Sequence, residues 1–166
     1  MIEAVIIGLA VLLDQLTKIW AVDALADGAM TIIPKVLDFR YFENTGAAFS
    51  MLSNGTLLLT AISALMSIAL IVVIFKYRDK MPRFVSIMLA FLTAGAIGNL
   101  IDRVFAGFVV DFIEFTFVNF AVFNVADIYV TCSAIALGVY LIFTKKGRAF
   151  YNSIGEKKET KEESAQ

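Results

Sequence analysis

The amino-acid sequence predicts an all-α membrane protein with four transmembrane helices and a small β-structure on the extracytoplasmic side. Hydrophobic residues make up 60% of the chain, above the roughly 45–50% of soluble domains, and the mean hydropathy is +0.82. Several apolar stretches are long enough to cross about 30 Å of hydrocarbon. In 166 residues, four spans leave no room for a separate globular domain, so we expect one membrane domain over residues 1–150.

The first expected span, 4–22, resembles a secretory signal peptide in position but not in pattern. It lacks a basic leading segment, Asp14 and Lys18 interrupt its apolar run, and no small-x-small cleavage site follows cleanly. These features favour a retained transmembrane helix.

Three further spans follow. Residues 56–75 and 84–101 contain no charged side chain, and residues 120–143 form an apolar stretch that contains Asp127. Charge inside hydrocarbon is costly, so acids such as Asp127 indicate where function lies. The remaining segment, 151–166, is rich in Lys and Glu, and we expect a solvated tail.

The connections between the first and second spans, 23–55, and between the third and fourth, 102–119, are expected to lie on the extracytoplasmic side and to carry structure of their own. Residues 37–42 alternate imperfectly between the two faces of a strand. Asn44-Thr45-Gly46 then supplies a turn, and residues 47–49 are expected to begin a returning strand. The second connection is rich in phenylalanine, which predicts a segment in the membrane interface with its rings toward lipid.

The distribution of basic residues predicts the orientation in the membrane, because short cytoplasmic loops carry the excess of Lys and Arg. Ten of the 14 basic residues fall between the second and third spans or after the fourth. Both termini are therefore expected in the cytoplasm. These ten residues are Lys76, Arg78, Lys80, Arg83, Lys145, Lys146, Arg148, Lys157, Lys158 and Lys161.

The choice of catalytic side chains is narrow. The chain has no histidine, which removes Ser-His-Asp and Cys-His nucleophiles and the commonest metal ligand. Its one cysteine, Cys132, lies in the fourth span and is expected to be a packing residue. Carboxylates remain as the candidates.

Polar residues recur at helical spacing within the spans. Asn99, Asp102 and Arg103 share one face at the end of the third span, and Asp14 and Lys18 are four residues apart in the first. One reading makes them functional. The other makes them structural, with Asp14 neutralised by Lys18 and Asp102 by Arg103, and the spacing leaves both readings open.

Asp111 and Asp127 differ because no basic residue lies within four positions of Asp127, and Asp111 is flanked by apolar residues. Both are expected near the outer end of the bundle. If their carboxyls approach closely, both cannot ionise cheaply, so one keeps a proton and the other acts as a base. The alternative is two separate interfacial acids that are hydrogen-bonded to the backbone.

Five blocks in order along the chain resemble the signature of prolipoprotein signal peptidase, the signal peptidase II family. They span residues 14–127. The blocks are Asp14-Gln15-x-Thr17-Lys18, Asn44-x-Gly46-Ala47-Ala48-Phe49, Gly98-Asn99-x-x-Asp102-Arg103, Val110-Asp111-Phe112 and Phe123-Asn124-x-Ala126-Asp127.

The resemblance implies an aspartyl endopeptidase with Asp111 and Asp127 as the catalytic pair. It implies supporting roles for the other matching residues, with Asn99 and Asn124 positioning the aspartates and Arg103 and Asn44 contacting the substrate. The supporting set is Asp14, Lys18, Asn44, Gly46, Asn99, Asp102, Arg103 and Asn124.

The resemblance also implies the setting. The substrates would be diacylglyceryl-modified prolipoproteins, cut before the lipidated cysteine, in the bacterial cytoplasmic membrane with the active site near its outer face. An extracytoplasmic β-cradle would correspond to residues 31–52 and a short interfacial helix to 104–120. We expect membrane lipid as a partner, a monomer, and no nucleic acid, cofactor or metal.

Two other classes of function fit an apolar chain with buried acids. Intramembrane acids mark ion pathways, so a small transporter or proton-conducting subunit is one rival. The acids crowd toward one face and no internal repeat is visible, which disfavours it. A non-enzymatic assembly factor, with polar residues that hold partner helices, is the other.

Overall fold

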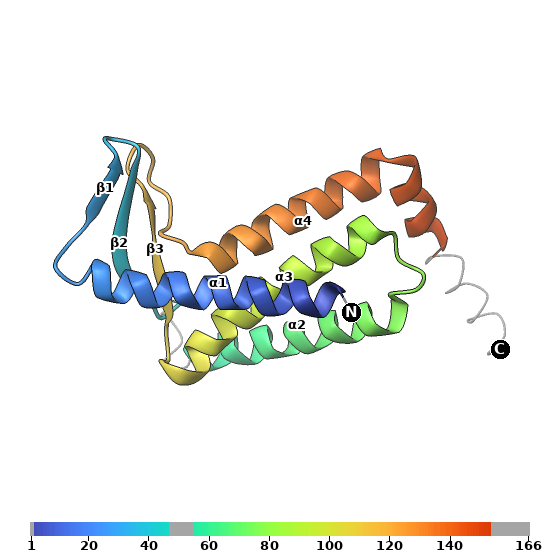
Figure 1. Ribbon diagram of the computed structural model, residues 1–166, viewed down its shortest axis with the longest axis horizontal. Helices are drawn as coiled ribbons and strands as arrows, with labels where there is room; N and C mark the ends of the chain where they lie inside the picture. The colour runs from blue at the N-terminus through green and yellow to red at the C-terminus, as the bar shows by residue number, and fades with distance from the viewer. Residues whose placement is uncertain (1, 47–54, 154–166) are drawn as a thin grey trace.

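A computed structural model describes residues 2–46 and 55–153. Four of its helices are long and apolar enough to cross a membrane, which confirms the predicted class of multi-span helical protein. A three-stranded sheet lies at one end of the bundle (Figure 1). The elements are α1 (Ile2–Ala24), β1 (Met30–Ile33), β2 (Leu37–Asn44), α2 (Gly55–Tyr77), α3 (Arg83–Phe105), β3 (Val109–Phe115) and α4 (Val125–Phe143).

Helix α3 is the centre of the bundle, since α1, α2 and α4 all pack against it. Its buried face is lined mainly with small residues, including Ala90, Ala94, Gly95 and Gly98. Small side chains let helix backbones approach closely, which is how helices associate in lipid without a hydrophobic driving force.

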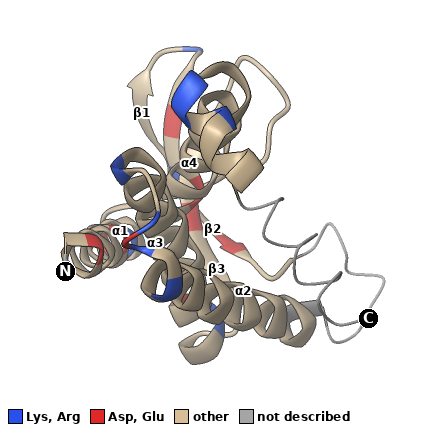
Figure 2. Ribbon diagram, turned by 90° about the vertical axis from the view of Figure 1, so that its right-hand side faces the viewer, with Lys and Arg blue, Asp and Glu red and all other residues tan. Residues whose placement is uncertain are grey.

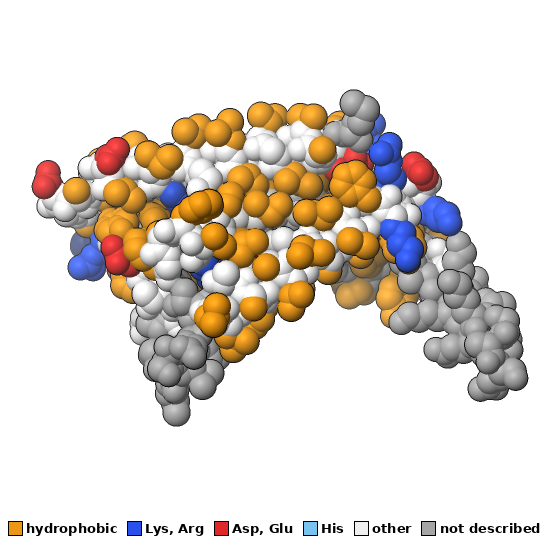
Figure 3. All heavy atoms as spheres, turned by 90° about the horizontal axis from the view of Figure 1, so that it is seen from below, with side chains coloured by type: hydrophobic (Ala, Val, Ile, Leu, Met, Phe, Trp, Pro, Cys, Tyr) orange, Lys and Arg blue, Asp and Glu red, His pale blue; other side chains and the backbone are white. Residues whose placement is uncertain are grey.

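The outside of the bundle is apolar. Side chains such as Leu9 and Leu65 are 62% and 68% exposed, and in Figure 3 hydrophobic side chains cover the middle of the bundle while most charges lie toward its two ends. A soluble protein does not expose an apolar surface of this extent. The arrangement matches helices that face lipid along their length.

Two glycines of α3 set the distance to the neighbouring helices. A Cβ atom on Gly95 would lie 2.5 Å from the carbonyl oxygen of Ala126 in α4. A Cβ atom on Gly98 would lie 2.5 Å from Oδ2 of Asp14 in α1. The Asp14 carboxyl therefore occupies space that only a glycine leaves free.

The sheet has the order β1-β2-β3, and both strand pairs are antiparallel. Its inner side rests on the end of α1, where Ala21 and Leu25 form a buried cluster with Val110 and Phe112. Phe112 also makes an edge-to-face contact with Trp20, with ring centroids 6.1 Å apart. The bundle thus supplies the support that an isolated small sheet lacks.

The predicted interfacial helix at 104–120 is wrong. Residues 106–124 are all described and include no helix, and Val109–Phe115 forms strand β3. The strand is favoured because its backbone groups pair with β2, with Phe39 opposite Ile113 and Phe42 opposite Asp111. Contrary to the prediction, the phenylalanine rings of this segment do not all face outward: Phe112 is buried among protein side chains, whereas Phe117 is exposed.

Two predicted helix boundaries also differ from those in the structure. Helix α3 continues through Phe105, beyond the predicted end at residue 101, and α4 begins at Val125 where residue 120 was expected. Residues before α4 are held by the sheet, because Phe123 pairs with Ile113. The returning strand predicted at 47–49 lies outside the described residues, as does most of the tail.

The sheet and the basic residues lie at opposite ends of the molecule. Figure 1 places the start of α1, the α2–α3 connection and residues 145–153 at the end away from the sheet. Figure 2 views this end and shows Lys and Arg gathered there. The charge asymmetry that the sequence predicted therefore coincides with the two ends of the bundle.

We predict that Gly98→Ala lowers the thermal unfolding temperature in detergent, because the new Cβ would overlap the Asp14 carboxyl. Overpacking of this kind costs about 1–3 kcal/mol. Gly138→Ala in α4 is the matched control, because nothing lies within 4 Å of its Cβ position, and it is expected to leave the unfolding temperature unchanged or raised. Equal effects of the two substitutions would contradict the role of Gly98.

Candidate active site

The site is organised around the buried ammonium group of Lys18 in α1. Its Nζ lies 2.9 Å from Oδ2 of Asp14 and 3.0 Å from Oδ2 of Asp102. It also donates a hydrogen bond of 2.9 Å to Oδ1 of Asn99. The side chain is 3% exposed, so all three of its hydrogens are used within the protein.

The two carboxylates that neutralise Lys18 also bind backbone groups at the ends of other elements. Oδ1 of Asp14 accepts a hydrogen bond of 2.9 Å from the N–H of Ala126, in the first turn of α4. Oδ2 of Asp102 accepts one of 3.1 Å from the N–H of Val110 in β3. Free N–H groups at a helix N-terminus attract carboxylates. The Lys18 cluster thereby holds α1, α3, α4 and β3 in one arrangement.

Asp127 lies in the first turn of α4, where it forms a capping box with Asn124. The Asn124 side chain accepts a hydrogen bond from the Asp127 N–H at 2.9 Å, and Oδ2 of Asp127 accepts one from the Asn124 N–H at 3.2 Å. Oδ1 of Asp127 accepts a third from Nδ2 of Asn99 at 2.8 Å. Both oxygens of the carboxylate therefore face N–H donors.

Asp111 lies on β3 and receives its own pair of donors. Nδ2 of Asn124 donates to its Oδ1 at 2.6 Å, and Nδ2 of Asn44 donates to its Oδ2 at 2.8 Å. Asn44 reaches it because antiparallel pairing puts Asn44 of β2 opposite Val109 of β3. The Asn124 side chain thus touches both aspartates, with its amide group on Asp111 and its carbonyl oxygen on the Asp127 backbone.

The Asp111 carboxyl is 1% exposed, and this burial raises its pKa to about 6. That pKa is the net result of several effects: the Asn44 amide lowers it, the nearby Asp127 carboxylate raises it, and the Asn124 amide and the charge of Lys18 lower it. A carboxyl with a pKa near 6 is suited to hold and release a proton close to neutral pH.

A groove of about 230 Å³ opens beside Asp127, between α2, α3 and α4. One wall is apolar and comes from α2, with Ile62, Met66 and Leu70. The groove therefore has an apolar wall and a carboxylate side by side, an arrangement that suits an amphiphilic ligand. Its polar lining residues are Ser63, Asn99, Arg103 and Asp127.

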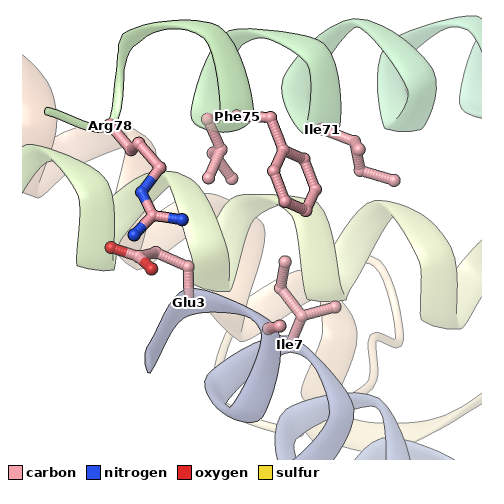
Figure 4. Close-up of a pocket in the computed structure, with 7 residues that line it drawn as sticks. Glu3, Ile7, Ile71, Phe75 and Arg78 are labelled. Atoms are coloured by element: carbon pink, nitrogen blue, oxygen red, sulfur yellow. The ribbon is translucent and has the colours of Figure 1, made fainter. Parts of the chain in front are cut away.

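Another hollow, of about 150 Å³, lies between α1 and α2 near the end away from the sheet. Figure 4 shows Ile7, Ile71 and Phe75 around it, with Glu3 and Arg78 pointing toward each other at its rim. None of the residues that line it belongs to the hydrogen-bonded network around Lys18, Asp111 and Asp127, whereas Asn99 and Asp127 line the groove, so the groove is the candidate site.

Comparisons with known proteins show the family and agree with the fold. A family model for signal peptidase (SPase) II matches residues 6–143. The chain belongs to the signal peptidase II family. Lipoprotein signal peptidases of Clostridium novyi and Caldanaerobacter subterraneus are 40% and 44% identical over 144 and 140 residues, covering 84% of this chain and 97% and 94% of theirs. A bacterial membrane enzyme solved by the in meso method at 1.9 Å resolution superposes with a TM-score of 0.76 and 30% identity, covering 86% of this chain and 94% of that one.

As a member of the lipoprotein signal peptidase family, the chain is a multi-span membrane protease that removes signal peptides from prolipoproteins. Its structure brings most of the residues that the sequence singled out into one hydrogen-bonded network. These are Asp14, Lys18, Asn44, Asn99, Asp102, Asp111, Asn124 and Asp127.

Gly46 and Arg103 lie at the margin of this network. The Gly46 N–H donates to Oδ1 of Asn44 at 2.9 Å, and its φ of +80° is one that glycine adopts without strain. Arg103 does not form the ion pair with Asp102 that the sequence left open, since Asp102 pairs with Lys18. Its Nη1 instead lies 3.4 Å from Oγ of Ser63 and from the carbonyl oxygen of Asn99.

Two further residues of the site were not predicted. Gln15 donates to Oδ1 of Asp102 at 3.0 Å and to the carbonyl oxygen of Gly98 at 3.2 Å, so it closes the Lys18 cluster. Gln15 stands in the first of the five matching blocks and three residues before Lys18 on the same helix face, and that spacing could have singled it out. Ser63 in α2 carried no signal, because one serine on an apolar span is ordinary.

No group of three His, Cys, Asp or Glu side chains within residues 2–46 and 55–153 is placed to hold a metal ion. The same part of the chain contains no buried side-chain nitrogen or oxygen without a hydrogen-bond partner.

We predict that Lys18→Met strongly destabilises the protein, because it leaves Asp14 and Asp102 as buried acids without their cation. Breaking a buried pair in this way costs about 3–5 kcal/mol. Lys146→Met is the matched control, since Lys146 is exposed and surface changes stay within about 0.5 kcal/mol. Thermal unfolding in detergent measures both, and a Lys18→Met protein as stable as the control would contradict the role of the ammonium group.

Proposed function

We propose that this chain is an aspartyl endopeptidase that cleaves diacylglyceryl-modified prolipoproteins immediately before the lipidated cysteine, with Asp111 and Asp127 as its catalytic pair. The observation that carries the proposal is the convergence of both aspartates on Asn124. They are 16 positions apart in the chain and come from a strand and a helix, yet the Asn124 side chain contacts the carboxyl of Asp111 and the backbone N–H of Asp127, and the Asn124 backbone N–H contacts the Asp127 carboxyl. The charge of Asp127 raises the pKa of Asp111, and two carboxyls that interact in this way can act as acid and base.

The reaction requires one ionised and one protonated carboxyl. The carboxylate takes a proton from a water molecule as the water oxygen attacks the scissile carbonyl carbon, and the other carboxyl gives its proton to the carbonyl oxygen. The resulting diol collapses: the C–N bond breaks, the amine takes the proton from the first carboxyl, and a diol proton returns to the second. One water is consumed, and both aspartates end in their starting states.

The groove fits a substrate that is held partly in lipid. Its α2 wall is apolar and Asp127 lies on its polar side, so a lipid-anchored polypeptide would present a peptide bond to the carboxylate with its apolar parts against Ile62 and Met66. Arg103 also lines the groove and would contact the backbone carbonyls of that polypeptide. Asn44, half-buried beside Asp111, is the corresponding contact from the sheet.

The proposed setting is the bacterial cytoplasmic membrane. Basic residues gather at the end away from the sheet, which by the positive-inside rule is the cytoplasmic end. Both termini would then be cytoplasmic, and the aspartates would lie near the outer face. We propose a single domain over 1–150, a charged tail over 151–166, and a monomer, since the described helices assemble the site within one chain.

We predict that Asp111→Asn and Asp127→Asn each nearly abolish cleavage of a lipidated prolipoprotein peptide by the purified protein in detergent. Asparagine keeps the shape of the side chain but neither takes nor supplies the proton, and acid–base assistance is worth about 10²–10⁴-fold per group. Thermal unfolding is measured alongside, to show that the variants fold.

Cys132→Ala is the control, because Cys132 is exposed on α4 and outside the network, and it is expected to cleave at the unmodified rate. A chelator is expected to leave the product yield unchanged. Folded Asp111→Asn or Asp127→Asn protein with full activity would exclude the aspartate pair.

A further inference from the structure

We infer that the two aspartates have fixed roles: Asp127 is the ionised carboxylate that activates water, and Asp111 carries the proton, with Asn99 and Asn44 as the positioning residues that hold each in its role. This assignment rests on the proposed aspartyl mechanism and names which carboxyl does what within it.

The position of Asp127 favours its ionised form. It is the third residue of α4, within the first turn, where the helix dipole stabilises negative charge. Its two oxygens accept from the Asn124 backbone N–H and from the Asn99 amide, and both of these bonds strengthen when the acceptor is ionised. It also lines the groove, where an attacking water would lie.

Lys18 determines which way the Asn99 amide faces. An ammonium group can only donate, so the Asn99 atom that lies 2.9 Å from Nζ of Lys18 must be the oxygen. The same oxygen accepts from Nδ2 of Asn124 at 3.1 Å. The NH₂ group of Asn99 is therefore turned toward Asp127, and a flipped amide would place donors against donors at both Lys18 and Asn124.

Asp111 lacks these advantages. It lies on a strand and is 1% exposed, and it meets the N-terminus of α4 through the side-chain amide of the N-cap Asn124, with no backbone N–H of the helix bound to its carboxyl. Its neighbours along the chain, Val110 and Phe112, are buried and apolar. A buried carboxyl without a cation in contact favours the neutral form. Asn44 and Asn124 donate to it, and their amides limit how far this preference extends.

The positive and negative charges of the other ionisable groups around Asp111 and Asp127 cancel. Lys18 and Asp14 come from α1 and Asp102 and Arg103 from α3, which gives two cations and two anions. The surroundings therefore tolerate one negative charge on the aspartate pair. The negative charge is most stable on Asp127, where N–H donors and the N-terminus of α4 stabilise it.

The test is the pH profile of kcat/KM for cleavage of a lipidated prolipoprotein peptide by the unmodified protein, Asn99→Ala and Asn44→Ala. Activity requires Asp127 ionised, which sets the acidic limb, and Asp111 protonated, which sets the basic limb. Removing a donor makes ionisation of its partner harder. Asn99→Ala is therefore expected to move the acidic limb to higher pH, and Asn44→Ala to move the basic limb to higher pH.

Each shift is expected to be about one to two pH units, the size that a lost hydrogen bond to a charged group produces. Asn152→Ala is the matched control, since Asn152 is exposed far from the site, and it is expected to leave both limbs in place. The opposite pattern, with Asn99→Ala moving the basic limb and Asn44→Ala the acidic limb, would reverse the assignment. Unmoved limbs would show that these amides do not set the roles.

Failure of the assignment and failure of the aspartyl mechanism are distinguishable. If folded Asp111→Asn or Asp127→Asn protein cleaves normally, the mechanism fails. If both are inactive and the limbs move in the reversed pattern, only the assignment fails. Should the alanine variants not fold, infrared spectroscopy of the unmodified protein and of Asp111→Asn gives the answer: the carboxylic acid C=O band that titrates with activity is expected to vanish in Asp111→Asn, and its persistence would place the proton on Asp127.

Discussion

One buried cation holds this protein's polar core together. Removing the ammonium group of Lys18 from water carries a large cost, and the cost is met only because Asp14 and Asp102 contact it directly and Asn99 accepts its third hydrogen. Each of those partners binds a further element of the structure. The bundle and the sheet therefore reach their relative positions through one charge, and a missing partner would leave a charge unpaired in an apolar surrounding.

Two asparagine side chains, Asn99 and Asn124, connect Lys18 to the two aspartates through hydrogen bonds. An amide donates from one end and accepts at the other, so once Lys18 orients Asn99, the donors and acceptors that follow have a defined direction. Asn124 continues the chain to Asp111 and also caps α4. Neutral connectors suit this purpose, because further charges would add to the cost of burial while amides transmit orientation without adding charge.

The membrane setting explains why the polar core can be so small. Without water between the helices, close packing of small residues along α3 supplies association, and Gly98 leaves the space that the Asp14 carboxyl fills. Many large apolar side chains of the helices face outward. The buried charged side chains, Asp14, Lys18, Asp102 and Asp111, are gathered in one network next to the sheet.

The sequence by itself determined the four apolar helices, the asymmetry of basic charge and most of the polar residues that the structure gathers into one hydrogen-bonded network. These features are local: a long apolar stretch, an i, i+3 or i, i+4 spacing, and acids in apolar surroundings. Tertiary structure decided what depends on distant segments. Strand β3 forms because β2 lies beside it, α4 begins at Val125 because Phe123 pairs with the sheet, and Asp102 takes Lys18 over its neighbour Arg103. A buried carboxylate pairs with whichever cation the packing brings within reach, and spacing along one helix cannot show which that is.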